Sequence, residues 1–273
     1  MDAVLSVNGC SFSYGEGRFC LRDISVAVRS GEFVGLVGPN GSGKSTLLRV
    51  MAGILRPPQG DVLVGGRPVS SYRRLELARQ VAFLPQSPTA SFEMTVREVV
   101  ALGRYPYLGP LGLLTESDSR VIRQALSDVE SGPLADRHFS TLSEGEKQRV
   151  LLASILAQEP RVMLLDEPAA ALDIHHKSHM FDLLWLLSRK GIGVVVVTHD
   201  LNSASEFCDT LALLQGGRIM EVGPPSQVMR EDLLAETYQT PLRVVDHPVT
   251  SSRMVLVLGR RLHGNGEART DRP

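Results

Sequence analysis

Three features are scarce in this sequence, and each scarcity argues against certain classes of protein or site. The 273 residues hold three cysteines, whose spacing fits neither a metal site nor a CxxC pair, so we expect reduced, mostly structural thiols. The formal net charge is −1, which argues against a nucleic-acid protein that relies on bulk positive charge. No apolar run approaches the roughly 18 residues that cross a bilayer, and the first residues lack a signal-peptide pattern. We therefore expect a cytoplasmic chain.

What the sequence does contain is a phosphate-binding pattern. Residues 38–46 read GPNGSGKST, and residues 38–45 match G-x-x-x-x-G-K-[ST] at each position. The apolar run before them predicts a buried strand, and the residues after them predict a helix. Such a loop turns backbone N–H groups toward an anion, its lysine reaches the β- and γ-phosphates, and its serine binds Mg²⁺. The predicted loop residues are Gly38, Pro39, Asn40, Gly41, Ser42, Gly43, Lys44, Ser45 and Thr46.

The remaining patterns predict an α/β fold of the P-loop NTPase (RecA-like) class. Short alternating segments over residues 4–28 indicate an antiparallel β-subdomain, and residues 95–130 have helical periodicity. Buried strands alternate with helices elsewhere, which indicates a mostly parallel sheet. We expect one domain over residues 1–260, with a catalytic core (1–88 and 160–260), an inserted helical subdomain (89–159) and a disordered tail (261–273).

Polar residues at the ends of predicted strands are the candidate catalytic groups. Asp166 and Glu167 follow an apolar strand, where the first can hold Mg²⁺ and the second can act as the base for the attacking water. His199 can donate to the γ-phosphate, and Gln86 can contact Mg²⁺ or the attacking water. Tyr14 can stack on an adenine base, although an ordinary strand aromatic would have the same spacing.

These motifs, in this order and spacing, resemble the nucleotide-binding subunit of an ABC transporter. The resemblance covers residues 4–230 and includes LSEGE (142–146), VMLLDEP (162–168) and ALD (171–173). It implies that ATP and Mg²⁺ are cofactors and that Asp173 belongs to the nucleotide site. It also implies that Ser143 and Gly145 of the signature motif contact the γ-phosphate bound to a second copy, in a head-to-tail dimer with two ATP molecules.

The signature motif departs from the common family pattern at two positions. Glu144 stands where glycine is common, and Glu146 stands where glutamine is common, although glutamate is also seen there. Both acids favour a helix N-terminus but would repel a phosphate that their side chains faced. We expect both side chains to point away from the nucleotide.

A shorter match suggests the subgroup. Residues 103–109 (GRYPYLG) resemble the ATPase subunits that import iron-siderophores, haem or cobalamin. In that group the region faces the membrane subunit, so we expect residues 87–109 to contact two permease subunits, with an external binding protein as an indirect partner. A proline-containing loop packed on the helices is the alternative. The chain would then lie peripherally on the cytoplasmic face of the membrane.

Other functions fit the motifs less well. A soluble ABC-type ATPase that acts on nucleic acid or ribosomes commonly has two motif sets or a coiled-coil insertion, and this chain has neither, so we expect no nucleic-acid partner. A small-molecule kinase would leave LSEGE without a purpose. Three histidines on one predicted helix, at positions 175, 176 and 179, lack further ligands at a suitable spacing and are interpreted as a solvated face.

Overall fold

The N-terminal part of the chain forms an antiparallel sheet. The computed structural model describes residues 3–15, 19–86 and 93–259. The sheet has the order β2-β1-β4-β5, and Val7 of β1 pairs with Val26 of β2 and with Val62 of β4. The predicted antiparallel subdomain is therefore confirmed and extended by a second hairpin. Its strands are β1 (Ala3–Ser13), β2 (Phe19–Arg29), β4 (Gln59–Val64) and β5 (Arg67–Pro68).

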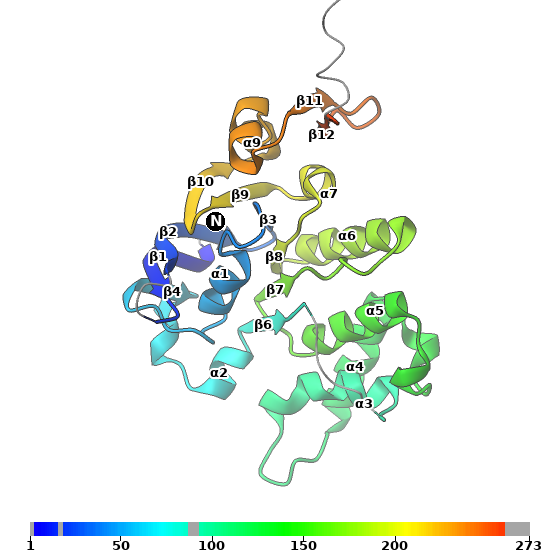
Figure 1. Cartoon of the computed structure of the whole chain (residues 1–273). Coiled ribbons are helices and arrows are strands. Elements are labelled where there is room, and N and C mark those ends of the chain that lie inside the picture. Colours follow the sequence, from blue (N-terminus) through cyan, green and yellow to red (C-terminus); the bar gives the residue numbers. More distant parts are fainter. Residues whose placement is uncertain (1–2, 16–18, 87–92, 260–273) are drawn as a thin grey trace, which may run out of the picture.

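A six-stranded, mostly parallel sheet forms the centre of the molecule (Figure 1), as the fold class predicts. Its order is β10-β9-β3-β8-β7-β6, and only the pair β9–β10 is antiparallel. Every residue of β3, β7 and β8 is buried, which explains their continuous apolar sequences. Because parallel strands end at the same edge, the residues that follow them meet there. The strands are β3 (Phe33–Val37), β6 (Val81–Leu84), β7 (Val162–Asp166), β8 (Gly193–Val197), β9 (Thr210–Gln215) and β10 (Arg218–Gly223).

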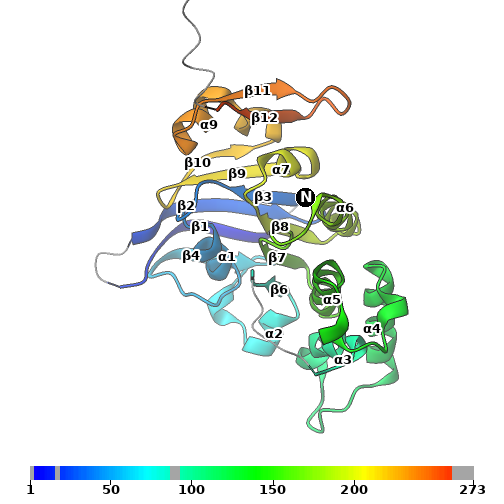
Figure 2. The ribbon, with the colours of Figure 1, turned by 45° about the vertical axis from the view of Figure 1, so that its right-hand side comes forward.

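Helices cover this sheet, and three of them form a separate layer between β6 and β7 in the chain (Figure 2). That layer contains the region of predicted helical periodicity, but prolines and glycines after residue 101 divide it into α3, a 3₁₀ segment η2 and α4. The helices are α1 (Lys44–Met51), α2 (Arg74–Ala78), α3 (Val96–Ala101), α4 (Glu116–Asp128), α5 (Glu144–Leu156), α6 (Ile174–Arg189), α7 (Leu201–Phe207), α8 (Pro225–Val228) and α9 (Glu231–Tyr238), with 3₁₀ turns η1 (Val69–Ser71), η2 (Leu102–Tyr107), η3 (Gly132–Leu134) and η4 (Phe139–Thr141).

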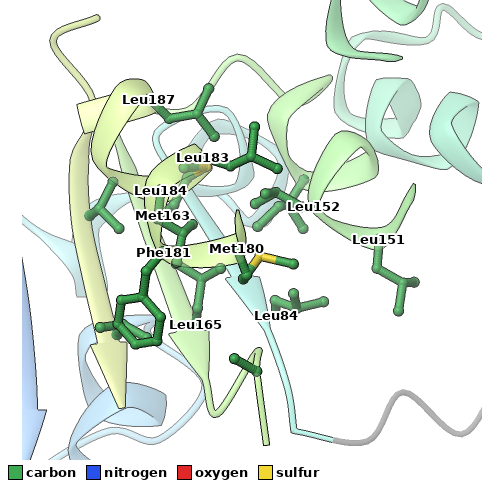
Figure 3. Packing of buried hydrophobic residues seen from close by; sticks show 14 of the residues in the cluster. Leu84, Leu151, Leu152, Met163, Leu165, Met180, Phe181, Leu183, Leu184 and Leu187 are labelled. Carbon is green, nitrogen blue, oxygen red and sulfur yellow. The ribbon is translucent and has the colours of Figure 1, made fainter. Parts of the chain in front are cut away.

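Two hydrophobic cores lie on opposite faces of the central sheet. Successive residues of β7 alternate between them: Met163 and Leu165 belong to the core with α5 and α6, whereas Leu164 belongs to the core with α1 and the antiparallel sheet. Figure 3 shows the first of these, where Leu184 of α6 packs near Met163. Burial on both faces fixes β7, and therefore fixes the acids at its end.

The C-terminal part adds a hairpin that the sequence analysis did not predict. Strands β11 (Leu242–Asp246) and β12 (Arg253–Val257) pair antiparallel beside α7. The Asn202 side chain of α7 accepts a hydrogen bond from Val255 N at 2.7 Å and donates one to Val255 O at 3.3 Å. The predicted disordered tail lies outside the described residues. Within the described ranges, no helix combines the length and apolar character needed to span a bilayer.

Candidate nucleotide-binding and catalytic site

The loop between β3 and α1 depends on glycine at two positions. Gly38 has φ 144°, and a Cβ there would lie 2.1 Å from the carbonyl oxygen of Leu214. Gly43 has φ 105°, and a Cβ there would lie 2.8 Å from the carbonyl oxygen of Cys20. Both positions combine a left-handed backbone with a close neighbouring carbonyl, so only glycine fits.

Polar groups of this loop are poised for an anion. The Ser42 hydroxyl is buried and has no hydrogen-bond partner among the described residues. Lys44 is 6% exposed, and its Nζ donates to the carbonyl oxygens of Gly38 (2.8 Å) and Pro39 (2.9 Å). Burial lowers the pKa of Lys44, while the nearby carboxylates of Glu167 and Asp166 act in the opposite direction. An unpaired hydroxyl, a lysine and a helix N-terminus together fit a phosphate chain.

Ser45 and Asp166 form a pair suited to a hard cation. The Ser45 hydroxyl donates to Asp166 Oδ1 at 2.9 Å. Burial raises the pKa of Asp166, and the hydrogen bond from Ser45 opposes part of that rise. A buried carboxylate beside a hydroxyl matches the oxygen ligands of Mg²⁺, which would neutralise phosphate charge at this place.

Glu167 brings the three predicted catalytic residues together. Its φ of 53° is unusual for a residue with a side chain, and its N–H donates to Val197 O at 3.1 Å. Gln86 Nε2 donates to Glu167 Oε2 at 2.8 Å, and His199 Nε2 contacts Glu167 Oε1. The carboxylate of Glu167 extends from a strained backbone and is contacted by two side chains, so it is suited to act as a positioned base. Contact of Gln86 with Mg²⁺ stays a prediction.

The cavity beside the loop reveals one further residue, Cys20, whereas Tyr14 is not among the described residues that line it. Stacking of Tyr14 on adenine stays a prediction. An opening of about 270 Å³ is lined by loop residues together with Cys20, Glu167 and His199. The Tyr14 hydroxyl lies 3.4 Å from Thr46 Oγ1, and its ring is half exposed, so it is available for stacking at this edge. Sequence analysis interpreted the cysteines as mostly structural, because nothing in the local sequence marks Cys20 as part of the cavity.

The predicted signature residues stand at the start of α5. Ser143 is the N-cap: its hydroxyl accepts from Glu146 N at 3.3 Å, and Glu146 Oε2 accepts from Ser143 N at 2.8 Å. Glu144 pairs with Lys147 at 2.7 Å. Both acids are thus engaged by their own first turn. Hydrogen bonds from Ser143, the backbone N–H first, lower the pKa of Glu146. Asp173 is the N-cap of α6.

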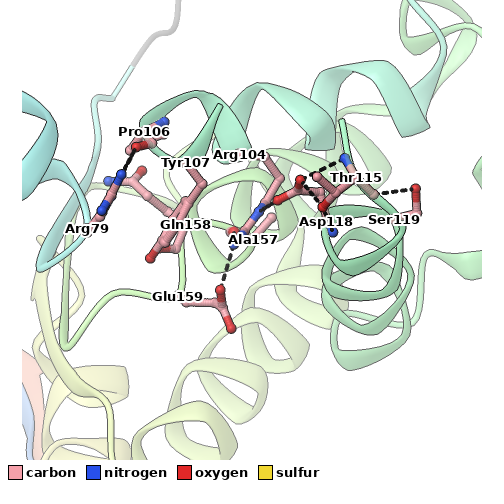
Figure 4. Close-up of polar contacts among 10 residues, drawn as sticks. All are labelled: Arg79, Arg104, Pro106, Tyr107, Thr115, Asp118, Ser119, Ala157, Gln158 and Glu159. Carbon is pink, nitrogen blue, oxygen red and sulfur yellow. Dashed lines mark hydrogen bonds and ion pairs between the residues drawn. The ribbon is translucent and has the colours of Figure 1, made fainter. Parts of the chain in front are cut away.

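The GRYPY segment (residues 103–107) contacts Arg79, Asp118 and Glu159 in a cluster that we call the joint (Figure 4). Arg104 is 4% exposed, and it pairs with Asp118 at 2.8 Å and with Glu159 at 2.7 Å. The Tyr107 ring lies between Arg104 and Arg79, whose guanidinium carbons are 3.9 and 4.8 Å from its centroid. Tyr107 is therefore partly buried by its neighbours, whereas the nearby Tyr105 is 66% exposed. Residues 87–92 of the predicted permease contact lie outside the described residues.

Comparisons with known proteins agree with this geometry. The family model described as "ABC transporter" matches residues 21–170. The chain is 45% identical to the hemin import ATP-binding protein HmuV of Nocardia farcinica, over 89% of this chain and 83% of that protein. It is 39% identical to the cobalamin import ATP-binding protein BtuD of Halobacterium salinarum (90% and 61%). It is 35% identical to the ferric enterobactin transport ATP-binding protein FepC of Escherichia coli (95% and 96%).

Solved structures have the same fold. An inward-facing metal-chelate type ABC transporter superposes with a TM-score of 0.84 at 27% identity, covering 96% of this chain and 100% of that chain. The dimeric bacterial ABC transporter cassette MJ0796 superposes with a TM-score of 0.70 at 28% identity, covering 81% and 98%. The phosphate loop, the acids at the end of β7 and these matches lead to one conclusion: the chain belongs to the ABC transporter family and is an ATP-binding, ATP-hydrolysing subunit.

Proposed function

We propose that two copies of this chain pair head-to-tail around two ATP molecules, and that the cycle powers import of an iron chelate (haem or a siderophore) or cobalamin through a membrane transporter. One observation carries the proposal: the functional groups are divided between two places. Lys44, Ser45 and Glu167 line one cavity, whereas Ser143 is exposed at the start of α5 and is not among the described residues that line it. A second copy in the opposite orientation supplies the missing side.

Within each site, the residues of this chain have separate tasks. Lys44 and the loop N–H groups hold the phosphates, and Ser45 and Asp166 are the groups that would hold Mg²⁺. Glu167 accepts a proton from the attacking water at a carboxylate oxygen. Gln86 and His199 hold that carboxylate in place. Ser143 and Gly145 of the partner, at the positive end of α5, stabilise the charge that develops on the γ-phosphate.

The dimer is tested with Glu167→Gln. This change removes the base but keeps a side-chain oxygen that can accept the hydrogen bond from the Gln86 amide. We expect this variant to be monomeric without nucleotide and dimeric with Mg-ATP, measured by light scattering after size exclusion. Glu167→Gln combined with Lys44→Ala is the matched control, because it also loses the phosphate contact and should stay monomeric. A Glu167→Gln protein that stays monomeric in saturating Mg-ATP would contradict the shared site.

The membrane contact is proposed for residues 87–109, at the cytoplasmic face, with two permease subunits that receive cargo from an external binding protein. Tyr105 supports this because a 66% exposed aromatic side chain is suited to a protein contact. In the reconstituted transporter, Tyr105→Ala should reduce uptake at least fivefold while ATP hydrolysis continues. Trp185→Ala, which changes an exposed aromatic on α6, is the control and should have no effect. Unchanged uptake in Tyr105→Ala would contradict this contact.

Haem is the first cargo to test, since the HmuV relative has the higher identity, 45% against 39% and 35%. The assay is ATP-dependent uptake of haem, cobalamin and a ferric siderophore into proteoliposomes with the complete transporter. Uptake of one cargo identifies the substrate. Uptake of none of the three would contradict the proposed substrate class without affecting the dimer.

A further inference from the structure

The first turn of α6 contacts α5, the helix that begins with the signature motif, as well as its own N-cap residue Asp173. Asp173 Oδ1 accepts from His176 N at 2.9 Å and lies 2.8 Å from His176 Nδ1. His179 instead pairs with Glu130 at 3.4 Å. Among the described residues, no group of three or more His, Cys, Asp or Glu side chains is placed so that it could hold a metal ion. However, the His176 side chain is only 39% exposed, so it is not simply part of a solvated face.

The His176 ring lies directly against Gly145. A Cβ on Gly145 would be 2.7 Å from His176 Cδ2, 3.1 Å from Cγ and 3.2 Å from Nε2. Gly145 is buried and does not have a positive φ. The lack of space beside the imidazole, rather than the backbone conformation, therefore favours glycine at this position. The two residues come from different helices, so this contact fixes the start of α5 relative to the start of α6.

The hydrogen bond to Asp173 fixes the orientation of this ring. With both the backbone N–H and Nδ1 of His176 directed at one carboxylate oxygen, the ring cannot turn away from Gly145 without losing a contact. The first N–H groups of α5, on Glu144 and Gly145, have no partner inside their helix and are available for an anion. An error of about 1 Å in placing such groups can reduce a rate about 100-fold.

We infer that His176 is a positioning residue for the signature motif. Its ring, held by Asp173, sets the place of Ser143 and Gly145 where they meet the nucleotide of the partner subunit. This inference rests on the proposed head-to-tail dimer. The inference predicts different effects on two functions of the chain. Binding of ATP through Lys44 and Ser45 does not depend on His176, whereas closure of the dimer does.

The first experiment measures both dimerisation and ATP binding in full-length Glu167→Gln protein. His176→Ala should weaken Mg-ATP-driven dimerisation about tenfold, measured by sedimentation. The ATP affinity of the dilute monomer, measured by calorimetry, should stay within twofold, which also reports that the variant is folded. His176→Phe keeps a ring against Gly145, and His176→Asn keeps a group that can bond to Asp173, so both should dimerise better than His176→Ala. His175→Ala removes the exposed neighbouring imidazole and is the matched control.

The outcomes distinguish the inference from the proposed function. If Glu167→Gln alone does not dimerise, the shared site is wrong and the inference falls with it. If Glu167→Gln dimerises and adding His176→Ala changes nothing, the inference alone is wrong. Loss of ATP binding by the His176→Ala monomer would show a general structural role and would also overturn it.

A mixed dimer tests whether the effect operates across the interface. One protomer carries Lys44→Ala and the other carries Ser143→Arg, which leaves one complete site, with its signature motif on the Lys44→Ala protomer. Adding His176→Ala to that protomer should reduce kcat at least fivefold more than adding it to the other. Equal losses from the two placements would overturn the inference.

Discussion

Two ion pairs in this chain have the same length and very different surroundings, which allows the effect of burial to be measured. Arg104 and Asp118 are joined at 2.8 Å with 5% and 7% of their side chains exposed. Arg97 and Asp136 are also joined at 2.8 Å, with 47% and 88% exposed. The chemical groups and the distance match, so a difference in stability between the pairs reflects their environment.

The expected magnitudes follow from that difference. At 2.8 Å the Coulomb attraction is about 1.5 kcal/mol in water and about 6 kcal/mol at an effective dielectric constant of about 20, and desolvation offsets much of the second value. Arg104 also donates to Ala157 O at 2.8 Å and to Glu159, and these bonds are lost with it. We expect Arg104→Met to lower the free energy of unfolding by about 3–5 kcal/mol, and Arg97→Met by less than about 1 kcal/mol.

Urea unfolding of two double-mutant cycles checks this reasoning. Asp118→Asn and Asp136→Asn remove the charges, and the first keeps an oxygen that can accept from Thr115. The coupling energy should be about 2 kcal/mol for Arg104 with Asp118, and no more than about 0.5 kcal/mol for Arg97 with Asp136. Equal coupling energies for the two pairs would refute the argument from burial.

Three further predictions concern the loop, the cavity and the joint. Gly38→Ala forces a methyl group against Leu214 O and should weaken ATP binding more than tenfold in calorimetry. Gly41→Ala shares the cost of a positive φ (75°) but meets no atom within 4 Å, so it should lose less; equal losses would contradict this. Alkylation of Cys20 should be slowed by Mg-ATP, as followed by mass spectrometry; unprotected labelling would place it outside the site. Hydrogen bonds from Thr115, then Arg104, hold the pKa of Asp118 at about 2 instead of 3.8. The stability that its ionised form contributes is therefore complete well above pH 3.8 and lost as the pH falls toward 2, so wild type and Asp118→Asn should converge in stability at low pH; a constant difference would oppose this.

The sequence predicted the central sheet and the residues at its edge because both depend on local signals. Continuous apolar runs such as Val162 to Leu165 indicate strands buried on both faces, and parallel strands bring their final residues together. For this reason Glu167 and His199, which lie 32 residues apart, could be expected in one site. Their direct contact, and the left-handed backbone of Glu167, required the structure.

Contacts between separate elements were not predictable in the same way. His176 was interpreted as part of a solvated face because no further ligands stand at a suitable spacing, while its contact with Gly145 depends on how α5 and α6 pack. Tyr107 was a candidate for the membrane contact, and its position between two arginines depends on the joint as a whole. The hairpin β11–β12 consists of two short strands that pair mainly with each other, so its periodicity was too brief to identify.

The strand order has a consequence for synthesis on the ribosome. Strand β3 leads into the phosphate loop, yet its neighbours β8 and β9 begin at Gly193 and Thr210, more than 150 residues later in the chain. Pairings between such distant segments form late, because the intervening chain must close a long loop first. A nascent chain that ends before β8 therefore exposes an unpaired apolar strand, and ATP cannot assist its folding until about three-quarters of the protein has emerged.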